Sequence, residues 1–485
     1  MKLILNGNIN KIYVQGLALI FYHGVKFPEG EENTDGLTLA IDVYESEGAV
    51  TCSATLTDGE REASYTASVS PENSESSDRV YKIAIGQAVY RVGSALTGKV
   101  AGYGILTGIR PSKVAAEIIN AVGIEKAREI LTDRYLMSPD KAELCLAVAE
   151  NEMKILSLTD DSKCSIYISI PFCPSRCTYC SFISCATKKL LSLIPEYLDK
   201  LCCEIKSAFE TAKKCGLTVS CVYIGGGTPT ILTEEQLEKL LSTVSKCVDV
   251  SALDEYTLEG GRPDTVTEGK LGIAKKYGVT RISVNPQTMN DSVLEKIGRR
   301  HTVKDFVSAF EKVKASGISC VNTDLIAGLD GDDYESFKHT VDSIIELDPD
   351  NVTVHSFCVK NASTVRAEDK DIYEKNDKMA IQCVDYSVRR LLDSGYIPYY
   401  MYRQKNTVGN SENVGYSKPD APGLYNVFMM SDAHTVFGVG AGSTTKLVSH
   451  TDGEKIQRIF SSKYPYEYLK DTRDTKELIK EFFRR

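Results

Sequence analysis

Strand-like and helix-like hydrophobic patterns alternate along the chain from Ser165 onward. Short apolar runs typical of buried strands are separated by longer segments with the spacing of an amphipathic helix. The expected strands are Ile166–Ile170, Val219–Ile224, Glu255–Leu258, Arg281–Val284, Cys320–Ile326 and Val352–Ser356, and the expected helices are Ile194–Ala212, Glu234–Val248, Thr265–Tyr277, Asp305–Ser316 and Tyr334–Leu347. Repeated βα units imply a parallel sheet. Six of them predict an α/β fold, a partial (β/α)6 barrel whose working face lies at the carboxyl ends of the strands.

Before residue 160 the pattern of apolar and polar residues is different. Short β-type runs, such as Thr38–Tyr44 and Ala49–Leu56, alternate with acidic and Gly-containing turns, and apolar spacing predicts a helix from about Arg79 to Leu96. We expect a small α+β domain over 1–97 and a helical linker over 98–160, in which Ser112 caps a helix. The barrel should span 161–370, followed by a C-terminal α/β extension over 371–485.

Composition and charge narrow the function classes. The 485 residues predict two or three domains. The formal net charge of -9 and a pI near 5.4 argue against an extended nucleic-acid footprint. The sequence has no apolar run long enough to span a bilayer, and its first residues lack the apolar core of a signal peptide. We therefore expect a cytoplasmic protein whose fifteen cysteines stay mostly reduced.

Three cysteines stand close together after the first expected strand of the barrel. Cys173, Cys177 and Cys180 form the pattern C-x3-C-x2-C, and a short loop can wrap three thiolates around one soft ion or cluster. A structural zinc site would need a fourth nearby ligand, but no His is close and Cys185 falls outside the usual spacing. Three ligands on a [4Fe-4S] cluster leave one iron open for chemistry. The alternatives are a structural zinc loop or three buried, inert thiols.

The cysteine spacing, with Tyr179 just before the last cysteine, resembles the signature of the radical S-adenosylmethionine (SAM) enzymes. Three glycines, Gly225, Gly226 and Gly227, follow the next expected strand and precede Thr228. Consecutive glycines let the backbone approach a ligand closely, although tight turns use them too. In this position they resemble the radical-SAM motif that receives the SAM amine. The resemblance implies two cofactors, a [4Fe-4S] cluster and SAM.

Further matches, in chain order, are similar to one family, the oxygen-independent coproporphyrinogen III oxidases and their relatives. Tyr167, six residues before the first cysteine, resembles a family tyrosine near the SAM-bound cluster. Glu259 looks like the carboxylate that receives the SAM amino group, and Gln287 and Asp324 look like the ribose-binding pair. Arg299 looks like the arginine that pairs with the SAM carboxylate. A lone Asp, Glu or Arg is more often a cap, a turn residue or a surface charge, but coincidence is improbable for the whole set in family order.

The chain departs from the oxidases at the position two residues after the third cysteine. Phe182 stands there in place of a fourth cysteine, as in the haem-chaperone relatives. Their His-Asn-x-x-Tyr-Trp haem motif appears only as Glu412-Asn-Val-Gly-Tyr-Ser417, without the axial His. The chain therefore resembles a third branch, the coproporphyrinogen-dehydrogenase-like proteins, which carry an extra N-terminal domain. We expect Cys185 only to pack.

The resemblance implies radical oxidative decarboxylation of coproporphyrinogen III propionates to vinyl groups, giving protoporphyrinogen IX in haem biosynthesis. The C-terminal extension would cover the active site, and a reduced flavodoxin- or ferredoxin-type protein would supply electrons. No catalytic residue is assigned beyond the cluster and SAM site. Two other hypotheses stay open: a haem-binding chaperone that keeps the cluster, and a radical-SAM enzyme with another substrate. Aromatic, amide and cationic residues suited to a tetrapyrrole are Tyr402, Arg403, Lys405, Asn413 and Tyr416.

Overall fold

The computed structural model describes residues 1–28, 36–72, 75–108, 110–180, 182, 185–358, 370–404 (backbone alone over 370–376), 407, 410–450, 453 and 455–484. The chain divides into two compact units. One unit comprises Met1–Glu150, Lys370–Glu374 and Met401–Asn406, and the other comprises Asn151–Asp369, Lys375–Tyr400 and Thr407–Arg485. Each unit is built around a sheet of its own.

The first unit is a four-stranded sheet with helices packed against it. The strands lie in the order β1 (Lys2–Asn6), β2 (Leu37–Ser46), β3 (Ala49–Asp58) and β4 (Arg61–Val69). The helices are α1 (Lys11–Phe21), α2 (Ser77–Thr97), α3 (Pro111–Val122), α4 (Ile124–Glu129) and most of α5 (Pro139–Leu156). Alternate residues of β3 are buried, as expected of a sheet with one covered face. The expected α+β character of this part is confirmed, although α1 was not predicted.

The expected cap at Ser112 is wrong. Helix α3 begins one residue earlier, at Pro111, and Ser112 lies buried inside its first turn. Proline is favoured at the first helical position because its ring fixes φ near the helical value and its missing N–H needs no partner there. Among the described residues, the Ser112 hydroxyl has no hydrogen-bond partner.

The second unit contains an open sheet with a parallel centre, which confirms the α/β prediction. Its strands lie in the order β11-β12-β10-β9-β8-β7-β6-β5-β13-β14-β15, so in the described part of the chain β11 and β15 are edges and the barrel does not close. The pairs from β5 to β10 are all parallel. These strands are β5 (Lys163–Ile170), β6 (Thr218–Gly226), β7 (Glu255–Gly261), β8 (Arg281–Val284), β9 (Cys320–Ala327) and β10 (Asn351–Ser356).

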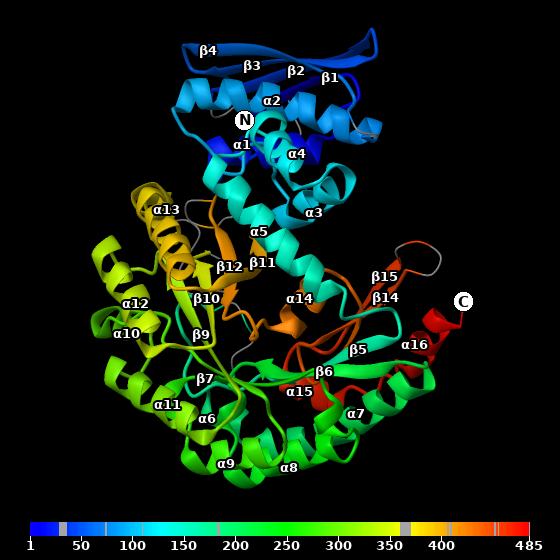
Figure 1. Ribbon diagram of the computed structural model, residues 1–485, viewed down its shortest axis with the longest axis vertical. Coiled ribbons are helices and arrows are strands. Elements are labelled where there is room, and N and C mark those ends of the chain that lie inside the picture. Colours follow the sequence, from blue (N-terminus) through cyan, green and yellow to red (C-terminus); the bar gives the residue numbers. More distant parts are fainter. Residues whose placement is uncertain are drawn as a thin grey trace. The chain divides into compact units, whose positions relative to one another are not determined.

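Helices cover the convex face of this curved sheet (Figure 1). Local sequence signals place their starts: Thr233 and Thr302 form capping boxes at α8 and α11, each satisfying otherwise unpaired backbone N–H groups. The bounds are α6 (Lys188–Leu191), α7 (Ile194–Lys214), α8 (Glu234–Ser245), α9 (Glu268–Lys276), α10 (Asp291–Lys296), α11 (Val303–Ser316), α12 (Tyr334–Leu347) and α13 (Lys370–Asp393).

The C-terminal part of the chain extends the sheet on both flanks. Strand β12 (Glu412–Ser417) runs antiparallel to β10 and is followed in the sheet by β11 (Ile397–Arg403). On the other side, β13 (Thr435–Val439) lies parallel to β5, with Thr435 opposite Cys164, and continues into β14 (Thr444–Ser449) and β15 (Lys455–Phe460). The remaining helices are α14 (Leu424–Met430), α15 (Pro465–Lys470) and α16 (Lys476–Phe483).

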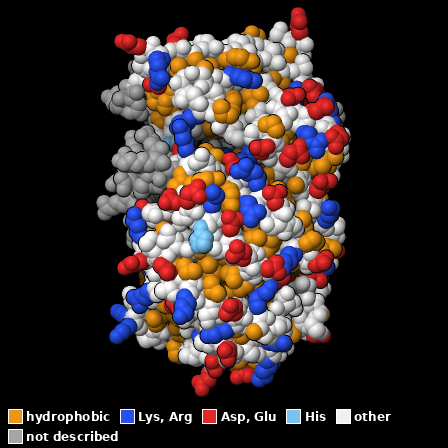
Figure 2. All heavy atoms as spheres, turned by 60° about the vertical axis from the view of Figure 1, so that its left-hand side comes forward, with side chains coloured by type: hydrophobic (Ala, Val, Ile, Leu, Met, Phe, Trp, Pro, Cys, Tyr) orange, Lys and Arg blue, Asp and Glu red, His pale blue; other side chains and the backbone are white. Residues whose placement is uncertain are grey.

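The structure also bears on the expectations about membrane spans, cysteines and surface charge. No helix in the described ranges is long and apolar enough to cross a membrane. All fifteen cysteines are free thiols. On the face that Figure 2 draws, acidic and basic side chains are interspersed, and the coloured residues of that face form no extended basic patch.

Candidate cofactor-binding site

The three cysteines of the motif lie on the loop between β5 and α6, at the carboxyl end of the first parallel strand. Cys173 and Cys177 are buried, and Cys180 is half-buried. Burial raises the pKa of the Cys173 thiol to about 12, although a hydrogen bond from the Thr228 hydroxyl acts in the opposite direction. Without a metal this thiol stays protonated at neutral pH. Iron must therefore displace a proton when it binds.

The chemistry of the loop's side chains suits an iron–sulfur cluster. The thiolates of an iron–sulfur cluster are bound by different iron atoms, so they do not need to converge on one point. The donor set of three free thiols on one loop therefore suits a cluster.

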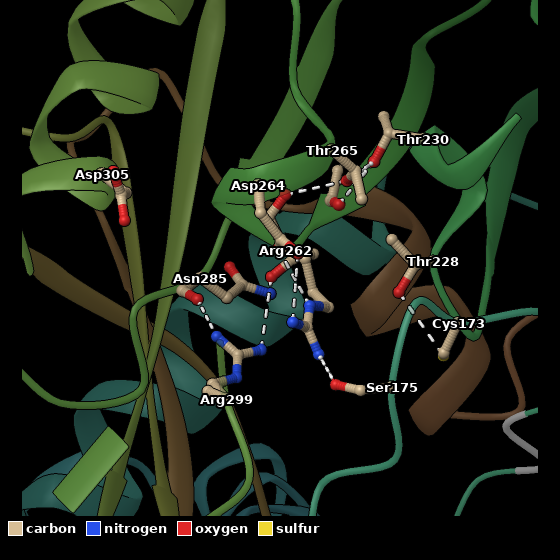
Figure 3. A network of polar contacts seen from close by, with 12 residues as sticks. Cys173, Ser175, Thr228, Thr230, Arg262, Asp264, Thr265, Asn285, Arg299 and Asp305 are labelled. Atoms are coloured by element: carbon tan, nitrogen blue, oxygen red, sulfur yellow. Dashed lines mark hydrogen bonds and ion pairs between the residues drawn. The ribbon is translucent and has the colours of Figure 1, made fainter. Parts of the chain in front are cut away.

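A buried arginine fastens the cysteine loop to the end of β7 (Figure 3). Arg262 pairs through Nε and Nη2 with the two carboxylate oxygens of Asp264, at 3.0 and 3.2 Å. Its Nη1 donates to Ser175 Oγ at 2.6 Å, and Ser175 in turn donates to the Gly298 carbonyl at 3.3 Å. This clamp was not predicted from the sequence, where its only signal is an arginine followed by Pro and Asp directly after a strand.

The glycine triplet ends β6 and lies against the cysteine loop. A Cβ atom at Gly227 would lie 2.6 Å from the Phe172 carbonyl oxygen and 2.9 Å from Cys173 Sγ, so a side chain there would push the loop away. A Cβ atom at Gly225 would lie 2.6 Å from Glu259 Oε2. The Gly226 N–H donates to the same Glu259 oxygen at 3.3 Å. The triplet therefore forms a close-fitting wall between the loop and the next strand.

Glu259 lies on β7 with its side chain half-buried. Desolvation raises the pKa of its carboxyl group to about 8; the nearby Asp324 carboxylate adds to this effect, and the Gly226 N–H opposes it. The described residues form no ion pair with Glu259. A carboxylate in this position is suited to receive an ammonium or amine group from a ligand.

Gln287 and Asp324 meet between β8 and β9. The Gln287 N–H donates to the Asp324 carbonyl at 3.1 Å, and Gln287 has a left-handed backbone with φ of 71°. Its side-chain Oε1 is buried and has no partner within the described chain. Asn285 Nδ2 donates to Asp324 Oδ2 at 2.8 Å, while its Oδ1 accepts the Asp324 N–H at 3.1 Å. A strained backbone and an unpaired amide oxygen together indicate a ligand site.

Arg299 follows α10 and is buried. It donates through Nη1 to the Asn285 carbonyl and through Nη2 to the Gly261 carbonyl, the latter at 3.4 Å. Figure 3 shows Arg299 beside Asn285, close to the Arg262 clamp. No carboxylate in the described ranges forms an ion pair with Arg299, and its Nε lacks a hydrogen-bond partner there. Arg299 also forms hydrogen bonds with the side chains of Cys177 and Tyr179. A buried guanidinium with no carboxylate partner among the described residues is suited to an anionic ligand group.

Tyr167 and Tyr179 are the last two of the expected cofactor residues. Tyr167 on β5 stacks with Tyr223 on β6, with ring centroids 6.0 Å apart, and Tyr223 stacks with Tyr425 on α14 at 4.6 Å. Burial raises the pKa of Tyr167 well above its ordinary value, as it does that of Tyr179, so both phenols are neutral. The expected cofactor residues thus lie on the parallel strands β5, β6, β7 and β9 or on the segments that follow β5, β6, β8 and α10, and their role in binding SAM stays a prediction.

The expected substrate residues divide between the two units. Arg403 belongs to the first unit, where it donates to the Leu106 carbonyl at 2.6 Å and stacks on Tyr103. Asn413 accepts the Ser356 N–H at 2.9 Å within the second unit. Tyr416 is fully buried and Tyr402 half-buried, and Lys405 lies outside the described residues. Their role in substrate binding stays a prediction.

Comparison with known proteins identifies the class. Residues 167–344 match the model of the radical SAM superfamily. This segment begins at Tyr167 and contains all of the cofactor residues expected from the sequence. The chain belongs to this superfamily, and membership implies a [4Fe-4S] cluster and SAM as cofactors. The three loop thiols, the glycine wall and Arg299, which has no carboxylate partner among the described residues, fit these cofactors.

Relatives identify the family within that class. The chain is 32% identical over 460 residues to the oxygen-independent coproporphyrinogen-III oxidase-like protein HemZ of Bacillus subtilis, covering 94% of this chain and 92% of HemZ. It belongs to this oxidase-like family. It is 38% identical over 199 residues to the heme chaperone HemW of the same organism, covering 40% and 51% of the two chains. The coproporphyrinogen III oxidase HemN of Escherichia coli superposes with a TM-score of 0.45 at 19% identity, covering 64% and 74%.

Proposed function

We propose that this protein is a radical-SAM oxidoreductase that decarboxylates propionate side chains of coproporphyrinogen III to vinyl groups, giving protoporphyrinogen IX. The observation that carries the proposal is the similarity to an oxidase-like protein over 94% of the chain, the N-terminal unit included. An electron carrier of the flavodoxin or ferredoxin type would serve as donor. The free cysteines are consistent with action in the cytoplasm.

The residues of the second unit would orient the cofactors. Arg299 would pair with the SAM carboxylate, and Glu259 with the Gly225–Gly227 backbone would receive the SAM amino group. Gln287 and Asp324 would hold the ribose, with Asn285 fixing both Asp324 and Arg299. When bound, the cluster and SAM together supply an organic radical able to abstract a hydrogen atom from the substrate. The chain contributes position and exclusion of water.

The tyrosine stack gives the site an aromatic wall next to Glu259. Tyr425 is buried, and Tyr167 and Tyr223 are half-buried. Desolvation raises the pKa of all three phenols above the ordinary value. Neutral rings offer apolar contact without a competing charge. A pyrrole ring of the substrate would pack against this wall, with its propionate directed toward the SAM site.

Anaerobic incubation tests the proposal. The reconstituted protein is mixed with SAM, a low-potential reductant and coproporphyrinogen III, and both 5′-deoxyadenosine and the tetrapyrroles are followed by chromatography and mass spectrometry. We expect vinyl products in step with 5′-deoxyadenosine. Formation of 5′-deoxyadenosine while the tetrapyrrole stays intact would refute this substrate and favour a radical-SAM enzyme acting on another compound.

The second candidate function is haem binding, because the heme chaperone HemW is 38% identical to this chain over 199 residues and Phe182 resembles the residue of that branch. Against it, Glu412 occupies the position of the axial histidine and is buried on β12. A haem titration of the cluster-loaded protein decides between the two. A stable stoichiometric complex without decarboxylation would favour the chaperone.

A further inference from the structure

Thr228 makes a contact that SAM binding does not require. Its hydroxyl donates to Cys173 Sγ at 3.4 Å, and both side chains are buried (Figure 3). Its backbone N–H donates to the Phe172 carbonyl at 2.8 Å, which fixes Thr228 directly beside the residue that precedes the cysteine. The hydroxyl is therefore held against the sulfur by its own main chain.

Gly227 makes this approach feasible. The preceding N–H, that of Gly227, donates to the Ile170 carbonyl at 2.8 Å, so β5 and the end of β6 remain in register up to the cysteine loop. A side chain at position 227 would collide with both the Phe172 carbonyl and the Cys173 sulfur. Two backbone hydrogen bonds and one glycine thus place a hydroxyl donor on a thiol that would bind iron.

We infer that Thr228 tunes the cluster, because its hydrogen bond to the Cys173 sulfur raises the reduction potential of the bound [4Fe-4S] centre. Hydrogen bonds to cluster sulfurs are among the factors that set such potentials. One-electron reduction adds one negative charge to the cluster and its thiolates and needs no proton. A donor aimed at a thiolate sulfur stabilises the more negative, reduced form more than the oxidised form. The inference rests on the cofactor assignment and is independent of the substrate.

The test compares Thr228→Val, which keeps the shape but loses the hydroxyl, with Thr228→Ser, which keeps the hydroxyl. Each reconstituted variant is titrated anaerobically with titanium(III) citrate and dye mediators, and the reduced cluster is measured by electron paramagnetic resonance. At the wild-type midpoint, we expect the ratio of reduced to oxidised cluster to fall roughly three- to tenfold in Thr228→Val, the range of one neutral hydrogen bond. A tenfold change corresponds to about 59 mV. Thr228→Ser should stay near the wild type.

Thr230 provides a matched control two residues further on. Its buried hydroxyl donates to the Gly260 carbonyl at 2.7 Å and contacts Thr265 rather than a sulfur. Thr230→Val also removes a buried hydroxyl, so a general loosening of the segment would affect both variants. We expect Thr230→Val to keep the wild-type potential at equal iron and sulfide content. An unchanged potential in Thr228→Val, or equal changes in the two valine variants, would overturn the inference.

A measurement on the wild type alone keeps the inference testable if Thr228→Val does not hold its cluster. The iron–sulfur(Cys) stretching bands are recorded by resonance Raman spectroscopy in H2O and D2O. If a hydroxyl donates a hydrogen bond to a cysteine sulfur, deuteration should shift one of these bands. Thr228→Ser should preserve the shift. Bands that do not respond to deuterium in the wild type would show that the bond is not made, whatever the variants do.

Discussion

Replacing Glu259 with glutamine should make the cofactor-free protein more stable at neutral and alkaline pH. The half-buried Glu259 carboxyl group is desolvated, lies near Asp324 and has no cationic partner among the described residues, so its pKa is about 8 in the folded protein against about 4.5 for an ordinary glutamate. Glutamine resembles the protonated, neutral acid. The variant therefore avoids the cost of placing a second negative charge in the site.

The size of the effect follows from proton linkage. Because the folded-state pKa is raised, the full stability is present below about pH 4.5 and is lost as pH rises toward 8. Each pH unit in this window costs about 1.4 kcal/mol. At pH 7 the wild type should be about 3 kcal/mol less stable than Glu259→Gln, and above pH 8 about 5 kcal/mol less stable. At pH 4.5 the two proteins should be equal.

Urea unfolding of the cofactor-free proteins at pH 5, 7 and 8.5 measures this difference. Glu255, four residues earlier on the same strand, is the control because it is buried in an ion pair with Arg281, Nε to Oε2 at 3.3 Å. Glu255→Gln should destabilise the protein, by about 3 kcal/mol, because it leaves the arginine buried without its partner. A Glu259→Gln variant that is less stable than the wild type at pH 8.5, or equally stable at every pH, would refute the reasoning. The same variant should bind SAM more weakly, so stability and affinity change in opposite directions.

Three further predictions concern the cofactors. Cys173→Ser should abolish the cluster and SAM cleavage, whereas Cys185→Ser should keep both, as measured by iron content and 5′-deoxyadenosine formation. SAM cleavage by Cys173→Ser would contradict the ligand assignment. Arg299→Gln should weaken SAM binding at least tenfold, the cost of about 1.5–3 kcal/mol for a lost charge-assisted hydrogen bond, as measured by equilibrium dialysis; unchanged affinity would argue against the carboxylate contact. Arg262→Gln should free the cysteine loop and speed iron loss to a chelator, with Asp264 left unpaired; an unchanged rate would mean that the clamp does not hold the loop.

The sequence sufficed for what is encoded locally. The six parallel strands were predicted because each is a short apolar run between amphipathic helices, and the cofactor residues stood at strand ends in family order. The clamp of Arg262 and the bridging role of Asn285 were missed, because each acts through partners that lie on other strands or loops. The pairing of β13 with β5 was not predictable for the same reason. The β13 segment has a strand-like sequence, but nothing in it specifies β5 as its neighbour. Helix α1 was missed because its short apolar stretch lies among β-type runs.

The pairing of β13 with β5 also fixes an order in time. The strand that leads into the cysteine loop has its second neighbour about 270 residues later in the chain, since Thr435 lies opposite Cys164. At about 5–20 residues per second, a ribosome needs roughly 15–55 s to make the intervening segment. Until then β5 has only β6 beside it, so the cysteine loop follows a strand whose other side is still unpaired. Iron delivered before β13 is made would meet an incomplete site, so cluster insertion should follow the pairing of β13 with β5.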